Sequence, residues 1–280
     1  MRYIYRVIKV IEIIGKKLKN LLIIICLLFS FSFGDTSNYV LQFDGTDDWV
    51  DVQNNNLNFG QGSFSILYKA KIEPPSDNQD VLLENIESNP GIVLFSNGRW
   101  LLRDVDGNEL NYQNLSIPDL ADNTWFEYLF KRDVETNLIS IFINGELFGS
   151  IYDITGDCSN SNSLLFMRQN PFNAFSKGEI DFIAIWDTAI NPNQIDFNSD
   201  DLVAHWDFNT GYGNVIFDKS GNEHNGIKNE DAVWIERIEG CLDSYATNYN
   251  SNVDINFQDG SCEYPDNGNY SLNFDGIDDY

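Results

Sequence analysis

Acidic and amide side chains gather in three stretches of the sequence, with the spacing of loops that bind divalent cations. The first stretch, FDGTDDW, contains Asp44, Asp47 and Asp48, and the second, DVDGN at residues 104–108, places such side chains at alternate positions. A third set lies within residues 240–264 and consists of Asp243, Asn248, Asn250, Asp254 and Asp259. Ca²⁺ prefers oxygen ligands of this kind, so calcium is a candidate cofactor. Turn formation is the alternative explanation of the first two stretches.

A single pair of acids has the spacing of a hydrolase. Glu179 and Asp181 stand in GEIDFIA like the first two acids of the E-x-D-x-x-E strand of jelly-roll glycanases, but Ala184 replaces the third. Retaining glycoside hydrolysis needs two carboxylates about 5 Å apart, one as nucleophile and one as acid/base. With Ala184 in place of the third acid, the second of these carboxylates is missing. The two histidines, His205 and His224, lie outside any Ser or Cys nucleophile motif. The sequence predicts a protein that is not an enzyme.

Aromatic side chains offer a second kind of chemistry, the stacking of sugar rings. The predicted platform consists of Trp100, Tyr112, Phe172 and Phe175. Ordinary packing of the loops is the alternative. Three other tryptophans fall within strand patterns and are expected in the core, namely Trp49, Trp125 and Trp186.

The elements that position these residues are predicted to be short strands. Alternating apolar segments occur at 64–70, 81–84, 91–95, 125–131, 138–143, 164–167 and 180–186. Asn97-Gly98, Asp106-Gly107 and Asn144-Gly145 separate apolar runs with residues that tolerate the positive φ of tight hairpins. Strands that recur at intervals of roughly 8 to 12 residues indicate an antiparallel β-sandwich.

Four segments of the chain resemble successive landmarks of one family. FDGTDDWVDV, SFSILYKAKI, ISIFINGELFGS and GEIDFIAIWDTAINPNQI are similar, in this order, to segments of laminin-G-like, concanavalin A-type jelly-roll domains. The resemblance implies an all-β sandwich of two antiparallel sheets, with the first strand beside a late one. It also implies that the strand at 178–186 turns four residues toward the core, namely Ile180, Phe182, Ala184 and Trp186.

Residues 202–234 resemble another segment of the same family, one that usually precedes the F-D-G strand. Two arrangements are open. These residues complete the sandwich, as in a circular permutation, or they belong to a following domain. We assign residues 35–238 to the laminin-G-like sandwich.

Residues 240–264 resemble the small Cys-bracketed modules that recur between domains of bacterial secreted and surface proteins, with the pattern G-C-x-D-x-x-A-x-N-Y-N and D-G-S-C. So short a segment cannot bury enough apolar surface to fold alone. We expect a Cys241–Cys262 disulfide to staple it, worth about 3 kcal/mol, and Cys158 to stay unpaired.

The opening of the sandwich is repeated near the other end of the sequence. Residues 38–49 and 269–280 align without a gap as N-Y-x-L-x-F-D-G-x-D-D and an aromatic residue. We therefore interpret residues 268–280 as the first strand of a second laminin-G-like domain, whose other strands lie beyond this sequence.

The first 34 residues differ in character from the rest. Lys16, Lys17 and Lys19 precede an apolar run at 21–33, and small residues at 32 and 34 suit a signal peptidase. We predict a signal peptide at 1–34. The alternative is a membrane anchor, but the apolar run is shorter than the roughly 20 residues that span a bilayer. The mature chain is then expected to have no membrane span.

Acidic residues dominate the remaining chain. Removing residues 1–34 takes away six basic residues and one acid, which leaves 11 basic and 42 acidic residues and a formal charge of −31. Because nucleic-acid binding needs a basic surface, this class of partner is excluded. Many carboxylates also favour divalent cations as partners.

Together these features predict a secreted or cell-surface module for recognition or adhesion. Its expected partners are glycans, glycosylated surface or extracellular proteins, and further domains of the same polypeptide. Two alternatives stay open, an architectural spacer that carries an enzyme or adhesin elsewhere and a degenerate glycanase.

We predict that the mature protein begins near Asp35, because the basic cluster, the apolar run and the small residues at 32 and 34 form a cleavable signal. N-terminal sequencing of exported protein checks this. Exported protein that retains residues 21–33 would contradict the prediction.

Overall fold

The computed structural model describes residues 38–53, 57–74, 80–86, 90–111, 113, 115, 117–229, 231–241, 243–249, 257–258 and 261–265. All of them belong to the second of two units, residues 1–36 and 37–280, into which contacts divide the chain. The predicted signal peptide (1–34) and second-domain strand (268–280) lie outside the described residues. The same holds for four predicted site residues, namely Tyr112, Asn250, Asp254 and Asp259. No helix in the described part of the chain is long and apolar enough to cross a membrane.

The first sheet is antiparallel, with the strand order β10-β9-β8-β3-β14-β1-β18 and with β15 paired to the far half of β14. Its strands are β1 (Tyr39–Asp44), β3 (Phe64–Ile72), β8 (Trp125–Asp133), β9 (Leu138–Ile143), β10 (Glu146–Tyr152), β14 (Lys177–Trp186), β15 (Leu202–Trp206) and β18 (Val233–Glu236).

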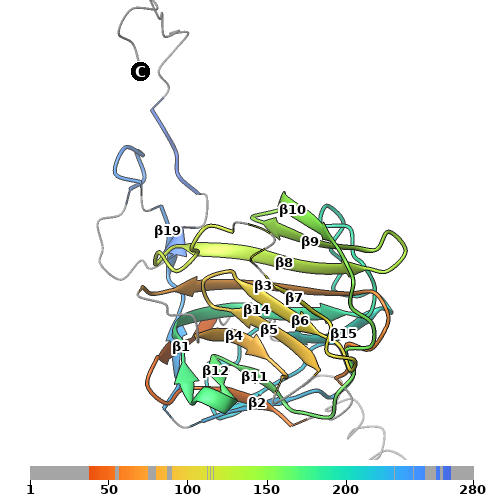
Figure 1. The fold of residues 1–280 in the computed structure, drawn as a ribbon. Helices are drawn as coiled ribbons and strands as arrows, with labels where there is room; N and C mark the ends of the chain where they lie inside the picture. The colour runs from red at the N-terminus through yellow and green to blue at the C-terminus, as the bar shows by residue number, and fades with distance from the viewer. Residues whose placement is uncertain are drawn as a thin grey trace, which may run out of the picture. The chain divides into compact units, whose positions relative to one another are not determined.

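The second sheet is also antiparallel and has the order β16-β17-β2-β11-β4-β5-β6-β7. Its strands are β2 (Val50–Val52), β4 (Val81–Glu84), β5 (Gly91–Phe95), β6 (Trp100–Arg103), β7 (Glu109–Asn111), β11 (Leu164–Phe166), β16 (Val215–Ile216) and β17 (Gly226–Lys228). Figure 1 shows β4 to β7 lying across β3, β8 and β14 of the first sheet. The predicted all-β jelly-roll sandwich is confirmed.

Two short pairs lie outside the main sheets. A hairpin joins β12 (Arg168–Gln169) and β13 (Ala174–Phe175) through the 3₁₀ turn η2 (Asn170–Phe172). In the small C-terminal module, β19 (Glu239–Gly240) pairs in parallel with β20 (Phe257–Gln258). The predicted Cys241–Cys262 disulfide is present there, and Cys158 is buried and free.

The space between the sheets is filled by one apolar core. Alternate residues of most strands enter it, for example Ile66, Tyr68 and Ala70 of β3. Aromatic rings pack in register across the strands, with the Tyr68 and Tyr128 rings stacked at 5.1 Å. Burial in this core raises the pKa of both tyrosines well above the usual value. Trp100 is fully buried and packs edge-on against the Phe130 ring at 5.4 Å.

Residues 202–236 add strands to both sheets. In the first sheet β15 pairs with β14 and β18 pairs with β1, and in the second sheet β17 joins β16 to β2. Of the two arrangements left open by the sequence, the structure has the one in which this segment completes the sandwich.

The predicted facing of strand β14 is wrong beyond its first half. A β-bulge between Ile180 and Phe182 shifts the register against β3, so the inward-facing residues after it are Ile183 and Ile185. Phe182, Ala184 and Trp186 pack instead against a separate cluster on the outer face, under the segment 187–201. A regular alternation continued past the bulge assigns each residue after it to the opposite face.

We predict that Trp100→Ala lowers the free energy of unfolding by about 3–5 kcal/mol, because it removes a buried indole from a close-packed core. The matched variant Phe172→Ala, at a ring that is 58% exposed, should change it by less than about 0.5 kcal/mol. Urea unfolding followed by far-ultraviolet circular dichroism measures both. Similar losses in the two variants would contradict the packing described for Trp100.

Candidate functional site

A pocket of about 170 Å³ opens on the outer face of the second sheet. Its floor is a row of directly paired residues on three neighbouring strands, Asp51 of β2, Leu165 of β11 and Glu84 of β4. They face outward because the residues on either side of Asp51, Val50 and Val52, belong to the core. The remaining lining residues are Trp49, Asn85, Ile86, Asn162, Ser163, Arg168 and Asn170.

One wall of the pocket is a stack of flat side chains. The Arg168 guanidinium carbon lies 4.7 Å from the ring centroid of Trp49 and 5.6 Å from that of Phe175, so it sits within cation–π range of both rings. Arg168 and Phe175 are partners across the β12–β13 hairpin. We call this site the Trp49–Arg168 pocket.

The hairpin that carries Arg168 is anchored to the sheet. The backbone N–H of Asn170 donates to Oε1 of Glu84 at 2.6 Å, and the Ser176 hydroxyl donates to the carbonyl of Val81 at 2.9 Å. Positive φ at Met167 (62°), just before β12, and at Asn173 (50°), between η2 and β13, turns the chain at these two points. These contacts hold Arg168 over the pocket.

Three buried polar atoms of the lining residues have no hydrogen-bond partner within the described part of the chain. They are Oδ1 of Asp51, Nδ2 of Asn85 and Nε of Arg168. Asn85 is only 2% exposed, and its Oδ1 accepts the N–H of Ile92 at 2.9 Å, which fixes the amide. A buried polar group without a partner costs about 1–3 kcal/mol, so these atoms favour a polar ligand.

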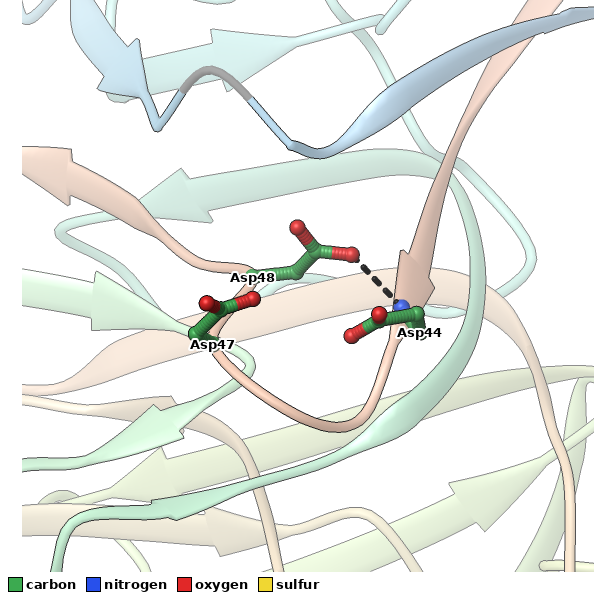
Figure 2. A group of neighbouring side chains, drawn as sticks. All are labelled: Asp44, Asp47 and Asp48. Atoms are coloured by element: carbon green, nitrogen blue, oxygen red, sulfur yellow. Dashed lines mark hydrogen bonds between the residues drawn. The ribbon is translucent and has the colours of Figure 1, made fainter.

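The predicted cation loop lies immediately before Trp49 in the chain. Asp44, Asp47 and Asp48 each offer a carboxylate oxygen, and these oxygens lie within 4.8 Å of one another. Figure 2 shows the three side chains grouped over the β1–β2 loop, with Asp48 Oδ2 accepting the N–H of Asp44 at 2.6 Å. Asp48 is 2% exposed, and its Oδ1 has no partner among the described residues. This donor set fits a divalent cation such as Ca²⁺.

The protonation of Asp48 reflects its surroundings. Desolvation by burial raises its pKa, and the charges of Asp44, Asp47 and Asp231 raise it further, against the lowering effect of the Asp44 N–H. A bound cation would act in the opposite direction because it favours the ionised form.

Asn229 ties the cation loop to the pocket wall. Its side chain donates to the carbonyl of Asp47 at 2.7 Å and accepts the N–H of Trp49 at 2.9 Å. Its own N–H donates to the carbonyl of Trp49 at 3.1 Å. The acidic cluster and the aromatic wall are therefore parts of one clamped loop.

The model of the concanavalin A-like lectin/glucanases superfamily matches residues 44–196, which include the acidic loop and every lining residue of the pocket. The chain belongs to this superfamily. No curated protein matches it.

Solved structures match this chain at low sequence identity. A protein from Bacteroides ovatus to which carbohydrate binding has been attributed matches with a TM-score of 0.56 and 16% identity, over 71% of this chain and 60% of its own length. A heptameric pentraxin from Limulus polyphemus gives a TM-score of 0.44 at 12% identity, over 71% and 95% of the two chains. Domain 4 of an extracellular arabinanase from Geobacillus stearothermophilus, solved with arabinotriose, gives a TM-score of 0.43 at 18% identity. The match covers 55% of this chain and 73% of that domain's chain.

The aromatic platform predicted from the sequence is only partly assembled in this superfamily member. Trp100 is wrong as a ligand-stacking residue, because its indole is fully buried in the core. Phe175 lies within cation–π range of Arg168, which lines the pocket, and Phe172 lies exposed at the tip of the same hairpin.

Sequence reasoning missed Trp49, which was expected in the core but is half-buried at the pocket wall. The alternation of V-D-V was the available signal, because it places positions 49 and 51 together on the outer face.

In the second predicted cation loop, Asp104 already has protein partners. Asp104 is buried and accepts four N–H groups, from the backbones of Asp106, Asn108 and Gly156 and from the Asn108 side chain. Burial alone would raise the pKa of Asp104, but these hydrogen bonds lower it. Turn formation accounts for this loop, as the alternative interpretation held.

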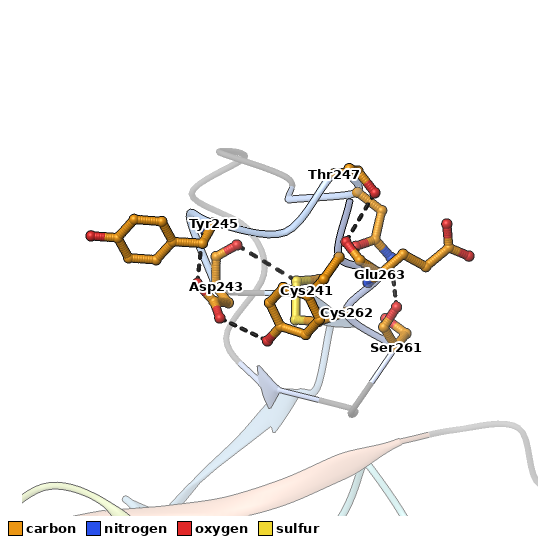
Figure 3. Close-up of a disulfide and its surroundings, with 9 residues drawn as sticks. Cys241, Asp243, Tyr245, Thr247, Ser261, Cys262 and Glu263 are labelled. Carbon is orange, nitrogen blue, oxygen red and sulfur yellow. Dashed lines mark hydrogen bonds between the residues drawn. A yellow bond between two sulfur atoms is a disulfide. The ribbon is translucent and has the colours of Figure 1, made fainter. Parts of the chain in front are cut away.

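In the disulfide module the acidic and amide groups brace the chain. Asp243 accepts the N–H of Tyr245 at 2.9 Å and the hydroxyl of Tyr264 at 2.7 Å (Figure 3). Asn248 donates to the carbonyl of Ser261 at 2.6 Å and accepts the N–H of Glu263 at 2.8 Å. These bonds join the two halves of the module next to the disulfide.

The two acids of the glycanase-like strand are held in ion pairs. Glu179 lies 2.7 Å from the Lys71 ammonium, and Asp181, the bulged residue, lies 3.2 Å from Lys69 and 2.6 Å from Arg237. Ala184 faces the buried outer cluster. Both carboxylates of this strand are therefore engaged in ion pairs.

We predict that Asp48→Asn stabilises the metal-free protein at pH 7 and has little effect near pH 3. The pKa of Asp48 in the folded protein lies above its ordinary value of 3.8, which applies to the unfolded chain. The contribution of this group to the free energy of unfolding therefore falls as the pH rises from the ordinary pKa to the pKa in the folded protein. Asparagine keeps an acceptor for the Asp44 N–H and removes the charge.

Urea unfolding with EDTA at both pH values measures the effect, with Asp200→Asn, an exposed carboxylate, as the control. An equal loss of stability at pH 3 and pH 7 would contradict the prediction, because it would assign Asp48 a purely hydrogen-bonding role.

Proposed function

We propose that this chain is a non-catalytic glycan-binding module, and that it binds sugar at the Trp49–Arg168 pocket. The observation that carries the proposal is the combination of an aromatic wall with unpartnered polar groups at one small pocket. The carbohydrate binding attributed to the Bacteroides ovatus protein of similar fold agrees with it.

The chemistry of the pocket suits a sugar. A sugar ring has apolar C–H surfaces, which pack on aromatic side chains, and a rim of hydroxyls, which need both donors and acceptors. Trp49 supplies the first kind of contact, and Asp51, Asn85 and Arg168 supply the second. The guanidinium stacked on Trp49 holds the ring in place before a ligand arrives, which reduces the entropy lost on binding.

The proposal includes a divalent cation, Ca²⁺, at Asp44, Asp47 and Asp48. It would satisfy the buried Oδ1 of Asp48 and relieve the repulsion among three close carboxylates. Because Asn229 binds both Asp47 and Trp49, a cation that orders this loop also orders the pocket wall.

Binding without catalysis is supported by the state of the acidic side chains on β14. Glu179 and Asp181 are paired with cations, and the position of a third acid holds Ala184. The proposed location is outside the cell or on its surface, in agreement with the signal-like segment 1–34 and with a laminin-G-like fold.

We predict that glycan-array binding by the wild-type protein is weakened about tenfold or more by Trp49→Ala, a loss of roughly 1.4 kcal/mol. Tyr152→Ala removes a ring that is 65% exposed on β10 of the other sheet and should leave binding unchanged. EDTA should weaken binding by the wild type, and added CaCl₂ should restore it.

Arrays without any glycan signal, or equal binding by the two variants, would contradict the assignment to this pocket. Binding that EDTA leaves unchanged would remove the cation from the proposal and leave the sugar site intact.

A further inference from the structure

The Trp49–Arg168 pocket is small for a glycan site. Its volume of about 170 Å³ lies well below the roughly 300–1,000 Å³ of pockets that enclose drug-sized ligands. The β12–β13 hairpin stands over it, held by the Asn170–Glu84 hydrogen bond. The site therefore has room for about one sugar residue.

The polar groups of the pocket call for a ligand that both donates and accepts hydrogen bonds. Asp51 Oδ1 is an acceptor, whereas Asn85 Nδ2 and Arg168 Nε are donors, and all three lack a partner within the described residues. A hydroxyl is donor and acceptor at once, so two adjacent hydroxyls can pair with the carboxylate and with the N–H groups together. A carboxylate accepts only and an ammonium group donates only, so neither satisfies the set.

The charge of the pocket favours neutral sugars over anionic ones. Two carboxyl side chains, Asp51 and Glu84, face one guanidinium, Arg168, and the whole chain has a formal charge of −26. Both the local and the overall charge repel anionic sugars such as uronates and sulfated residues.

We propose, building on the glycan-binding function above, that the Trp49–Arg168 pocket binds one neutral sugar residue through a pair of adjacent hydroxyls. The protein then recognises the end or a one-residue branch of a glycan rather than a stretch of its chain. Asp51 accepts from the hydroxyl pair, Asn85 and Arg168 donate to it, and Trp49 covers the C–H surface.

The test uses saturation-transfer NMR and calorimetry on the protein with calcium present. The probes are the methyl glycosides of glucose, galactose, mannose and arabinose, the corresponding trisaccharides, and glucuronate and galacturonate. At least one neutral glycoside should bind, its trisaccharide should bind within about threefold of it, and both uronates should bind at least tenfold more weakly. Deoxygenation of either hydroxyl of the recognised pair should weaken binding about tenfold or more.

A variant tests the role of Asp51. Asp51→Asn should weaken binding of the neutral glycoside about tenfold and reduce the ratio of its affinity to that of the uronates. Glu146→Gln, at an exposed acid on β10, should change neither the affinity nor the ratio. Unfolding curves of both variants show whether each is folded. If Asp51→Asn does not fold, binding of the neutral glycoside by Asn85→Ser, and binding of the deoxy glycosides by the wild type, test the same hydrogen bonds.

Tighter binding of a uronate, or an affinity that rises more than tenfold from monosaccharide to trisaccharide, would overturn this inference. Array signals without binding of any neutral monosaccharide would do the same. In these cases the Trp49-dependent array signal would still support the proposed function, whereas an array without signal would end both.

Discussion

The two sheets share one apolar core, and the need to fill it determines which face each side chain takes. Most strands present alternate residues to the core, so the intervening residues lie on an outer face where polar groups can remain hydrated. Trp100 turns inward to pack on Phe130, whereas Asp51 turns outward because Val50 and Val52 turn inward. The row of Asp51, Leu165 and Glu84 at the pocket is a consequence of this constraint.

The chain crosses from the first sheet to the second between β1 and β2, and the candidate sites gather at this crossing. The short connection contains the acidic cluster and Trp49, and it is held by Asn229, which follows β17 in the second sheet. Neighbouring pairs of strands bring these residues together although about 180 positions separate them in sequence. The segment 202–236 is therefore a structural part of the site as well as of both sheets.

The bulge in β14 shows how one extra residue changes the chemistry of a strand. Asp181 leaves the regular ladder at this point and pairs with Lys69 and Arg237, which are contributed by β3 and by the residue after β18. Beyond the bulge the strand turns apolar residues to both faces, because the segment 187–201 covers its outer side. A strand arranged in this way contributes to stability and offers no open row of carboxylates to a substrate.

Periodicity and turn chemistry in the sequence were sufficient to predict the all-β class, the hairpins and the disulfide, because these depend on neighbouring residues or on a single pair of cysteines. The alternation of V-D-V indicates that Trp49 faces outward, but it does not show which other segments form a pocket beside it. Nothing in the local pattern around Trp100 shows that its indole is fully buried. The bulge was equally invisible, because I-D-F-I-A-I-W alternates acceptably in either register. The pocket combines residues 49–51, 84–86 and 162–170, and only the pairing of β2 with β11 and of β11 with β4 places these segments side by side. Local sequence determines the conformation of each segment, but which side chains meet depends on strand register and on the packing of one sheet against the other.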